Sequence, residues 1–127
     1  MSDLNTKHNR VVWFDMPVAD LDRATRFYAG VLAIKVTREA FDGFEFAVFE
    51  HDQGNGGCLV PDADNVCQKG AMMYLNVDGR IRDAVAKVPG LGGAVKQDVH
   101  PIGPHGFRAL VLDSEGNRLA LHSNSDA

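Results

Sequence analysis

Apolar residues recur along this chain in patterns that predict two helices among short strands. Behind Asp20, which is suited to cap a helix, apolar residues follow one another at steps of three and four. These positions are Leu21, Ala24, Phe27, Tyr28, Val31 and Leu32. A second, shorter helix is predicted over Ile81, Ala84, Val85 and Val88. Pro89-Gly90 ends it, because proline cannot continue a helical hydrogen-bond ladder.

Eight stretches rich in β-branched and aromatic residues predict strands. They are residues 11–18, 34–37, 44–49 and 57–60 in the first half, and 71–77, 94–99, 107–112 and 118–122 in the second. Asp42-Gly43 and Asn55-Gly56 favour tight turns between neighbouring strands. Each half therefore consists of a strand, a helix and three strands, an order that predicts an α+β fold.

The two halves also align as an internal repeat. Gly54-Asn55 and Gly116-Asn117 are about 62 residues apart, and Gly116-Asn117 is expected to supply positive φ angles to a hairpin. At an offset near 59, Trp13 falls on Met72. We therefore expect one domain built by duplication. Its parts are a polar lead over residues 1–10, a first module over 11–61, a linker over 62–70 and a second module over 71–123.

Composition and charge argue against nucleic acid as a partner and against a membrane span. The 127 residues are 45% hydrophobic and 24% charged, as in an average globular domain. Thirteen Lys and Arg against 17 Asp and Glu leave no basic excess for nucleic acid. No apolar run is long enough to span a membrane, and two cysteines with a polar N-terminus favour a cytoplasmic location.

Two motifs resemble those of one protein family. The first is Asp-x-x-x-Ala-x-x-Phe-Tyr from Asp20 to Tyr28, and the second is Asp113-Ser-Glu-Gly-Asn-Arg118. At this spacing the chain resembles the vicinal oxygen chelate superfamily, which includes glyoxalase I, extradiol dioxygenases, and fosfomycin- and bleomycin-resistance proteins. The resemblance implies two tandem βαβββ modules that form a curved mixed sheet with a concave groove. It also implies a homodimer, with the groove formed either within one chain or by exchange of modules.

Catalytic relatives hold a divalent metal at four positions of the groove, usually with His, Glu or Gln. Counting from the motifs places these positions at Trp13, Cys58, Met72 and Ala120. Indole and methyl groups are not ligands, and the cations concerned prefer oxygen or imidazole donors. We therefore expect no metal cofactor.

A small-molecule pocket is the expected use of the groove, because apolar walls with a few polar groups are typical of such sites. The alternative is that the strand residues facing the groove are ordinary core residues and bind no ligand. The expected ligand-binding residues are Trp13, Cys58, Met72, Tyr74, Asn76, His105, Phe107, Arg118, Ala120 and His122. The proline-rich loop that contains His105 is a candidate lid.

Three functions remain open at this point. The preferred one is a binding protein for a small, partly apolar ligand, with no metal. The second is a lyase or isomerase in which His122 or Asp15 acts as the acid or base, or in which both residues hold a metal as substitute ligands. The third is a regulatory or accessory subunit whose groove has lost its role.

Overall fold

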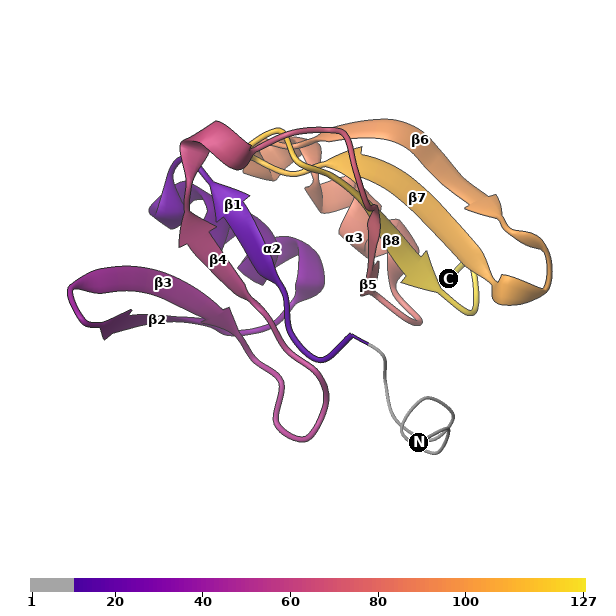
Figure 1. The fold of residues 1–127 in the computed structure, drawn as a ribbon. Helices are drawn as coiled ribbons and strands as arrows, with labels where there is room; N and C mark the ends of the chain where they lie inside the picture. Colours follow the sequence, from indigo (N-terminus) through magenta and orange to yellow (C-terminus); the bar gives the residue numbers. More distant parts are fainter. Residues whose placement is uncertain (1–10) are drawn as a thin grey trace.

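The computed structural model describes residues 11–127, which form two similar halves (Figure 1); the expected lead over 1–10 lies outside the described residues. The first half contains β1 (Asp15–Val18), α2 (Leu21–Leu32), β2 (Val36–Phe41), β3 (Phe44–Phe49) and β4 (Cys58–Pro61). The second contains β5 (Met73–Asn76), α3 (Ile81–Lys87), β6 (Ala94–Pro101), β7 (Phe107–Leu112) and β8 (Arg118–Ser123). Short 3-10 turns lie at η1 (Ala63–Asn65), η2 (Pro89–Leu91) and η3 (Gly103–His105).

Each half forms its own four-stranded mixed sheet. The strand orders are β1-β4-β3-β2 and β5-β8-β7-β6. The first and last strands of each half are parallel, and the remaining pairs are antiparallel. This confirms the α+β fold with two βαβββ modules, with the strands divided between two sheets. None of the helices among residues 11–127 has the length and apolar character needed to cross a membrane.

The offsets expected for the repeat reappear in the strand pairing. Asp15 pairs with Cys58 in the first sheet, and Tyr74 pairs with Ala120 in the second. Tyr74 lies 59 positions after Asp15, and Ala120 lies 62 positions after Cys58. Equivalent pairs in the two sheets are therefore related by the same two offsets as the sequence repeat.

Several strands begin or end away from their expected bounds. β1 begins at Asp15, because β4, its partner among residues 11–127, begins opposite it at Cys58; Trp13 therefore precedes the strand. Met72 likewise precedes β5. β2 extends to Phe41, because residues 42–43 form a tight hairpin at φ angles of 54° and 78°.

The core lies between each sheet and its helix. The Asp20 side chain caps α2 by accepting a hydrogen bond from the Arg23 N–H at 3.0 Å, as expected. Along the strands, alternate residues face the helices and are buried. The largest fully buried side chains are Tyr28, Phe27, Leu59, Ile81, Leu119, Leu121, Val18, Val31, Val88 and Val111, together with the polar Ser123. Intervening strand residues therefore point to the face of each sheet opposite its helix.

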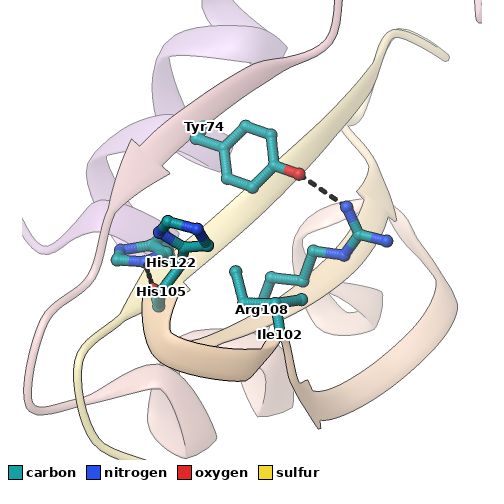
Figure 2. A pocket seen from close by; sticks show the side chains of 5 residues that line it. All are labelled: Tyr74, Ile102, His105, Arg108 and His122. Carbon is teal, nitrogen blue, oxygen red and sulfur yellow. Dashed lines mark hydrogen bonds between the residues drawn. The ribbon is translucent and has the colours of Figure 1, made fainter.

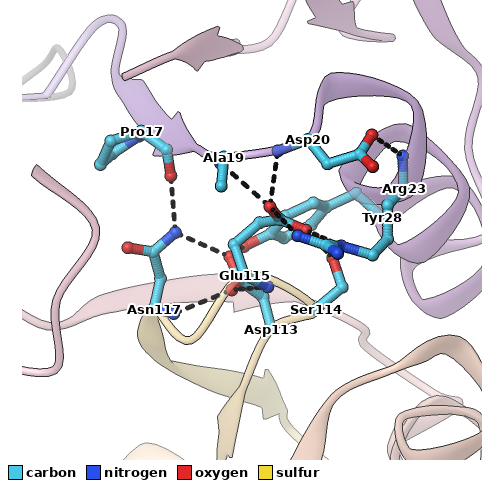
Figure 3. A network of polar contacts seen from close by, with 9 residues as sticks. All are labelled: Pro17, Ala19, Asp20, Arg23, Tyr28, Asp113, Ser114, Glu115 and Asn117. Atoms are coloured by element: carbon cyan, nitrogen blue, oxygen red, sulfur yellow. Dashed lines mark hydrogen bonds and ion pairs between the residues drawn. The ribbon is translucent and has the colours of Figure 1, made fainter. Parts of the chain in front are cut away.

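A polar network joins the two modules and connects the two motifs that carry the resemblance (Figure 3). The Glu115 carboxylate accepts hydrogen bonds from the N–H groups of Ala19 and Asp20, at 2.9 and 2.8 Å. Nε and Nη2 of Arg23 also donate to it, at 2.7 and 2.8 Å. The turn before β8 is thus bonded to the residues that open α2.

Asp113 lies at the buried end of this network. Its Oδ1 accepts from the N–H groups of Glu115 and Asn117, both at 2.8 Å. Its Oδ2 accepts from the Tyr28 hydroxyl at 2.5 Å and from the Asn117 side chain at 3.0 Å. Asn117 also donates to the Pro17 carbonyl at 2.7 Å. Gly116 alone supplies the expected positive φ, at 100°; Asn117 is instead a buried hydrogen-bonding residue.

Candidate functional site

The second sheet carries an open cavity of about 360 Å³ on the face opposite its helix (Figure 2). We call it the second-module pocket. Its lining residues are Tyr74, Ile102, His105, Arg108 and His122. Three of them come from the adjacent strands β5, β7 and β8, and two come from the loop that precedes β7. The pocket thus combines apolar surface with four side chains that can form hydrogen bonds.

Strand alternation explains why these side chains share a face. Leu75, Ala109 and Leu121 are buried toward the helix, so their neighbours in β5, β7 and β8 point the other way. Arg108 pairs directly with His122 across β7 and β8.

Hydrogen bonds fix the orientation of the polar groups in the pocket. Arg108 Nη1 donates to the Tyr74 hydroxyl at 2.5 Å, and Arg108 Nε donates to Nε2 of His100 at 3.0 Å. Nδ1 of His100 donates to the Asp98 carbonyl at 2.8 Å, which leaves its Nε2 free to accept from the arginine. His122 Nε2 lies 2.7 Å from the His105 carbonyl, which can only accept, so this nitrogen carries a hydrogen.

The structure brings three of the expected site residues together in this pocket: Tyr74, His105 and His122. Others of the second module lie elsewhere. Phe107 is on the helix-facing side of β7, since it pairs with the buried Ser123. The Asn76 side chain accepts from the N–H of Asp78 and so shapes the turn after β5.

The other expected site residues of the second module are partly or fully buried, or are bonded to the backbone. Met72 is half-buried ahead of β5, and Ala120 is fully buried beside Tyr74. Arg118 donates to the Gly70 carbonyl at 2.8 Å. It lines a smaller cavity of about 180 Å³ between the modules, together with Asp15.

The expected first-module residues lie outside the second-module pocket. Asp15 and Cys58 are on the face of the first sheet opposite α2, and Cys58 Sγ lies 3.2 Å from Asp15 Oδ1. Trp13 packs edge-on against His51, with ring centroids 5.5 Å apart. The structure therefore does not combine Trp13 and Cys58 with Tyr74 and His122 in one cavity. It also places the acid–base candidates Asp15 and His122 in separate cavities.

Arg108 and Ile102 were missed from the sequence. The signal for Arg108 was the alternation in β7: if Ala109 and Val111 face the core, Phe107 does too, and Arg108 faces the open side. Choosing the aromatic Phe107 for the pocket was an error of one residue in register. No comparable periodic signal marks Ile102, which lies in a loop before η3.

The side chains at the four positions matched to the metal ligands of relatives do not fit a divalent cation. Burial, and then the hydrogen bond to Asp15, raise the pKa of Cys58 to about 11, so its thiol is neutral near pH 7. Trp13, Met72 and Ala120 offer no oxygen or imidazole donor. Within residues 11–127, no three His, Cys, Asp or Glu side chains are grouped closely enough to hold a metal. These four residues therefore do not form a site for a divalent metal.

Comparisons with known proteins agree on one fold. No family model matches the chain. A glyoxylase-like domain-containing protein of Didymella fabae is 26% identical over 121 residues, which cover 90% of this chain and 93% of that protein. A glyoxalase/bleomycin resistance protein from Albidiferax ferrireducens superposes with a TM-score of 0.73 at 13% identity, covering 91% and 98% of the two chains. The fosfomycin resistance protein FosX from Listeria monocytogenes superposes at 0.68 and 14% identity, covering 91% and 93%.

Proposed function

We propose that this chain, which has the fold of glyoxalase/bleomycin resistance proteins, binds a small, partly apolar ligand in the second-module pocket without a metal. The observation that carries the proposal is the cavity itself. Its volume of about 360 Å³ lies within the range of roughly 300 to 1,000 Å³ that is common for small-molecule sites. A cytoplasmic location is part of the proposal and is supported by two cysteines that are free thiols.

The lining supports binding more than acid–base catalysis. Tyr74 and Ile102 provide apolar surface, Arg108 provides an oriented donor, and His122 provides an imidazole ring held by the His105 carbonyl. Of the two acid–base candidates, only His122 lies in this pocket, and its Nε2 is bonded to a backbone carbonyl. Asp15 lines the separate, smaller cavity, so the two residues do not face one ligand together.

Two naphthalene compounds of equal shape test ligand binding: neutral 2-naphthamide and anionic 2-naphthoate. Titration of the ¹⁵N-labelled protein is expected to shift the amide signals of β5, β7 and β8. Tyr74→Ala is expected to weaken binding of both compounds about fivefold, because an aromatic contact contributes about 1 kcal/mol.

Val12→Ala is the matched control, because Val12 is also an exposed apolar residue but precedes β1 in the first module. It is expected to leave both affinities unchanged. Absence of saturable shifts with both compounds, or equal loss in the two variants, would contradict the proposed pocket.

We further propose a homodimer in which the first sheet of one chain covers the second-module pocket of its partner. The proposal rests on two exposed apolar surfaces. On the face of the first sheet opposite α2, Phe41 and Phe44 are 76% and 46% exposed. The corresponding face of the second sheet carries the exposed Tyr74 at the pocket.

Static light scattering is expected to give about twice the chain mass of 13.8 kDa at micromolar concentration. Phe44→Asp is expected to shift the protein toward monomer, because it places a charge in an apolar interface. Ala40→Asp is the control, since Ala40 lies on the other face of β2. A single mass of one chain for the unmodified protein would exclude the dimer.

A further inference from the structure

We propose that the ligand of the second-module pocket carries a carboxylate that binds Arg108, attached to a flat apolar body. This inference rests on the proposed function and specifies the chemistry of the ligand. Its source is the arginine of the pocket wall: Arg108 is half-buried, yet it is not paired with an acidic side chain among residues 11–127.

Among residues 11–127, four arginines are paired with carboxylates, while Arg26, Arg108 and Arg118 are not. Arg26 is exposed, and Arg118 donates to the Gly70 carbonyl outside this pocket. Arg23, Arg38, Arg80 and Arg82 each form an ion pair with a carboxylate. Among residues 11–127, Arg108 has no such partner, and its donors reach only uncharged atoms of Tyr74 and His100.

The free side of the guanidinium is suited to a carboxylate. An arginine has five N–H groups in a planar fork, and Arg108 directs one from Nε to His100 and one from Nη1 to Tyr74. Its Nη2 has no partner within the described part of the chain. A carboxylate matches such a fork with two parallel hydrogen bonds, as a phosphate also does.

Charge in the pocket favours a single negative group. None of the five lining residues is acidic, and Arg108 is the one lining side chain that always carries a positive charge. A carboxylate would therefore be neutralised one to one. An ammonium group in the same place would meet the guanidinium with no compensating anion in the lining.

The rest of the lining defines the body of the ligand. The Tyr74 and His122 rings stand with centroids 6.4 Å apart and planes at 61°, so they form two aromatic walls at an angle. Figure 2 shows Ile102 near Arg108, on the side of the pocket away from the Tyr74 ring. A flat aromatic or unsaturated body fits against such walls better than a polar chain does.

Isothermal titration with 2-naphthoate and 2-naphthamide tests the inference, because the two probes differ mainly in charge. We expect the unmodified protein to bind naphthoate at least tenfold more tightly, and we expect that preference to fall as salt is added. Arg108→Gln is expected to weaken naphthoate binding by about 10- to 100-fold while changing naphthamide binding less than threefold, since a charged hydrogen bond contributes about 1.5–3 kcal/mol.

Two further variants test whether the naphthoate preference depends on the guanidinium group of Arg108. Arg108→Lys keeps the charge and loses the fork, so intermediate naphthoate affinity is expected. Arg26→Gln removes one positive charge from the exposed surface of α2 and is expected to leave both affinities unchanged.

The outcomes separate this inference from the proposed function. Binding of neither compound overturns the pocket and the inference together. Equal affinity for the two compounds in the unmodified protein overturns the carboxylate alone, and this measurement needs no variant to fold. An Arg108→Gln variant that folds and still prefers naphthoate also overturns it.

Discussion

Replacing Asp113 by alanine is expected to lower the free energy of unfolding by about 4 kcal/mol, because it removes the acceptor from a buried network. The side chain is 2% exposed and accepts four hydrogen bonds. Without it, the Tyr28 hydroxyl and the N–H groups of Glu115 and Asn117 lose their acceptor inside the protein. Urea denaturation at pH 7 measures the loss.

The Tyr28 hydroxyl provides a comparison within the same network. Burial, and then the adjacent Asp113 carboxylate, raise the pKa of Tyr28 well above its ordinary value, so the hydroxyl remains a donor. Tyr28→Phe removes one of the four donors and is expected to lower the free energy of unfolding by about 1 kcal/mol. The double variant Tyr28→Phe/Asp113→Ala is expected to have nearly the same free energy of unfolding as Asp113→Ala, within a few tenths of a kcal/mol. The reason is that both substitutions remove the same hydrogen bond. A cost below about 1 kcal/mol for Asp113→Ala would contradict the network.

The same network explains why the fold was predictable from the sequence. The motif from Asp20 to Tyr28 and the motif from Asp113 to Arg118 are bonded to each other, so their spacing records a tertiary contact. Apolar periodicity located both helices, and the Asp42-Gly43 turn located the first hairpin. The local patterns and the two motifs therefore indicated the same fold, and the two βαβββ modules could be predicted from them.

The pocket was less predictable, because its residues meet through the open faces of the strands and a loop. Tyr74 and His122 were found by counting along strands, whereas Arg108 required knowing which residues of β7 face the core. Trp13 and Cys58 were expected beside them from the family arrangement of paired modules. How two modules are placed relative to each other depends on contacts between distant surfaces, which periodicity within one strand does not encode.

Glu115→Gln is expected to lower the free energy of unfolding by about 2 kcal/mol at pH 7, because the carboxylate binds charged and backbone donors from the other module. Its side chain is fully buried and is bonded to Arg23 and to two N–H groups at the start of α2. A glutamine there keeps one acceptor oxygen but loses the charge and directs N–H groups at other donors.

The pH dependence of stability follows from the same carboxylate. Burial alone would raise the pKa of Glu115, but hydrogen bonds from Arg23, from the backbone of Asp20 and Ala19, and from Ser114 lower it from 4.5 to about 2. Because the pKa is lower in the folded protein than in the unfolded chain, the stabilisation is complete above pH 4.5. It is lost as the pH falls from about 4.5 to 2.

Urea denaturation across this pH range distinguishes the role of Glu115 from a general effect of acid. The unmodified protein is expected to lose stability between pH 4.5 and 2 more steeply than Glu115→Gln, whose side chain does not titrate. Glu45→Gln is the matched control, because Glu45 is an exposed glutamate paired with the exposed Arg38. It is expected to cost less than about 1 kcal/mol and to keep the steep acid loss, since exposed ion pairs contribute little. Equal acid dependence in the protein and in Glu115→Gln would show that the carboxylate does not hold the two modules together.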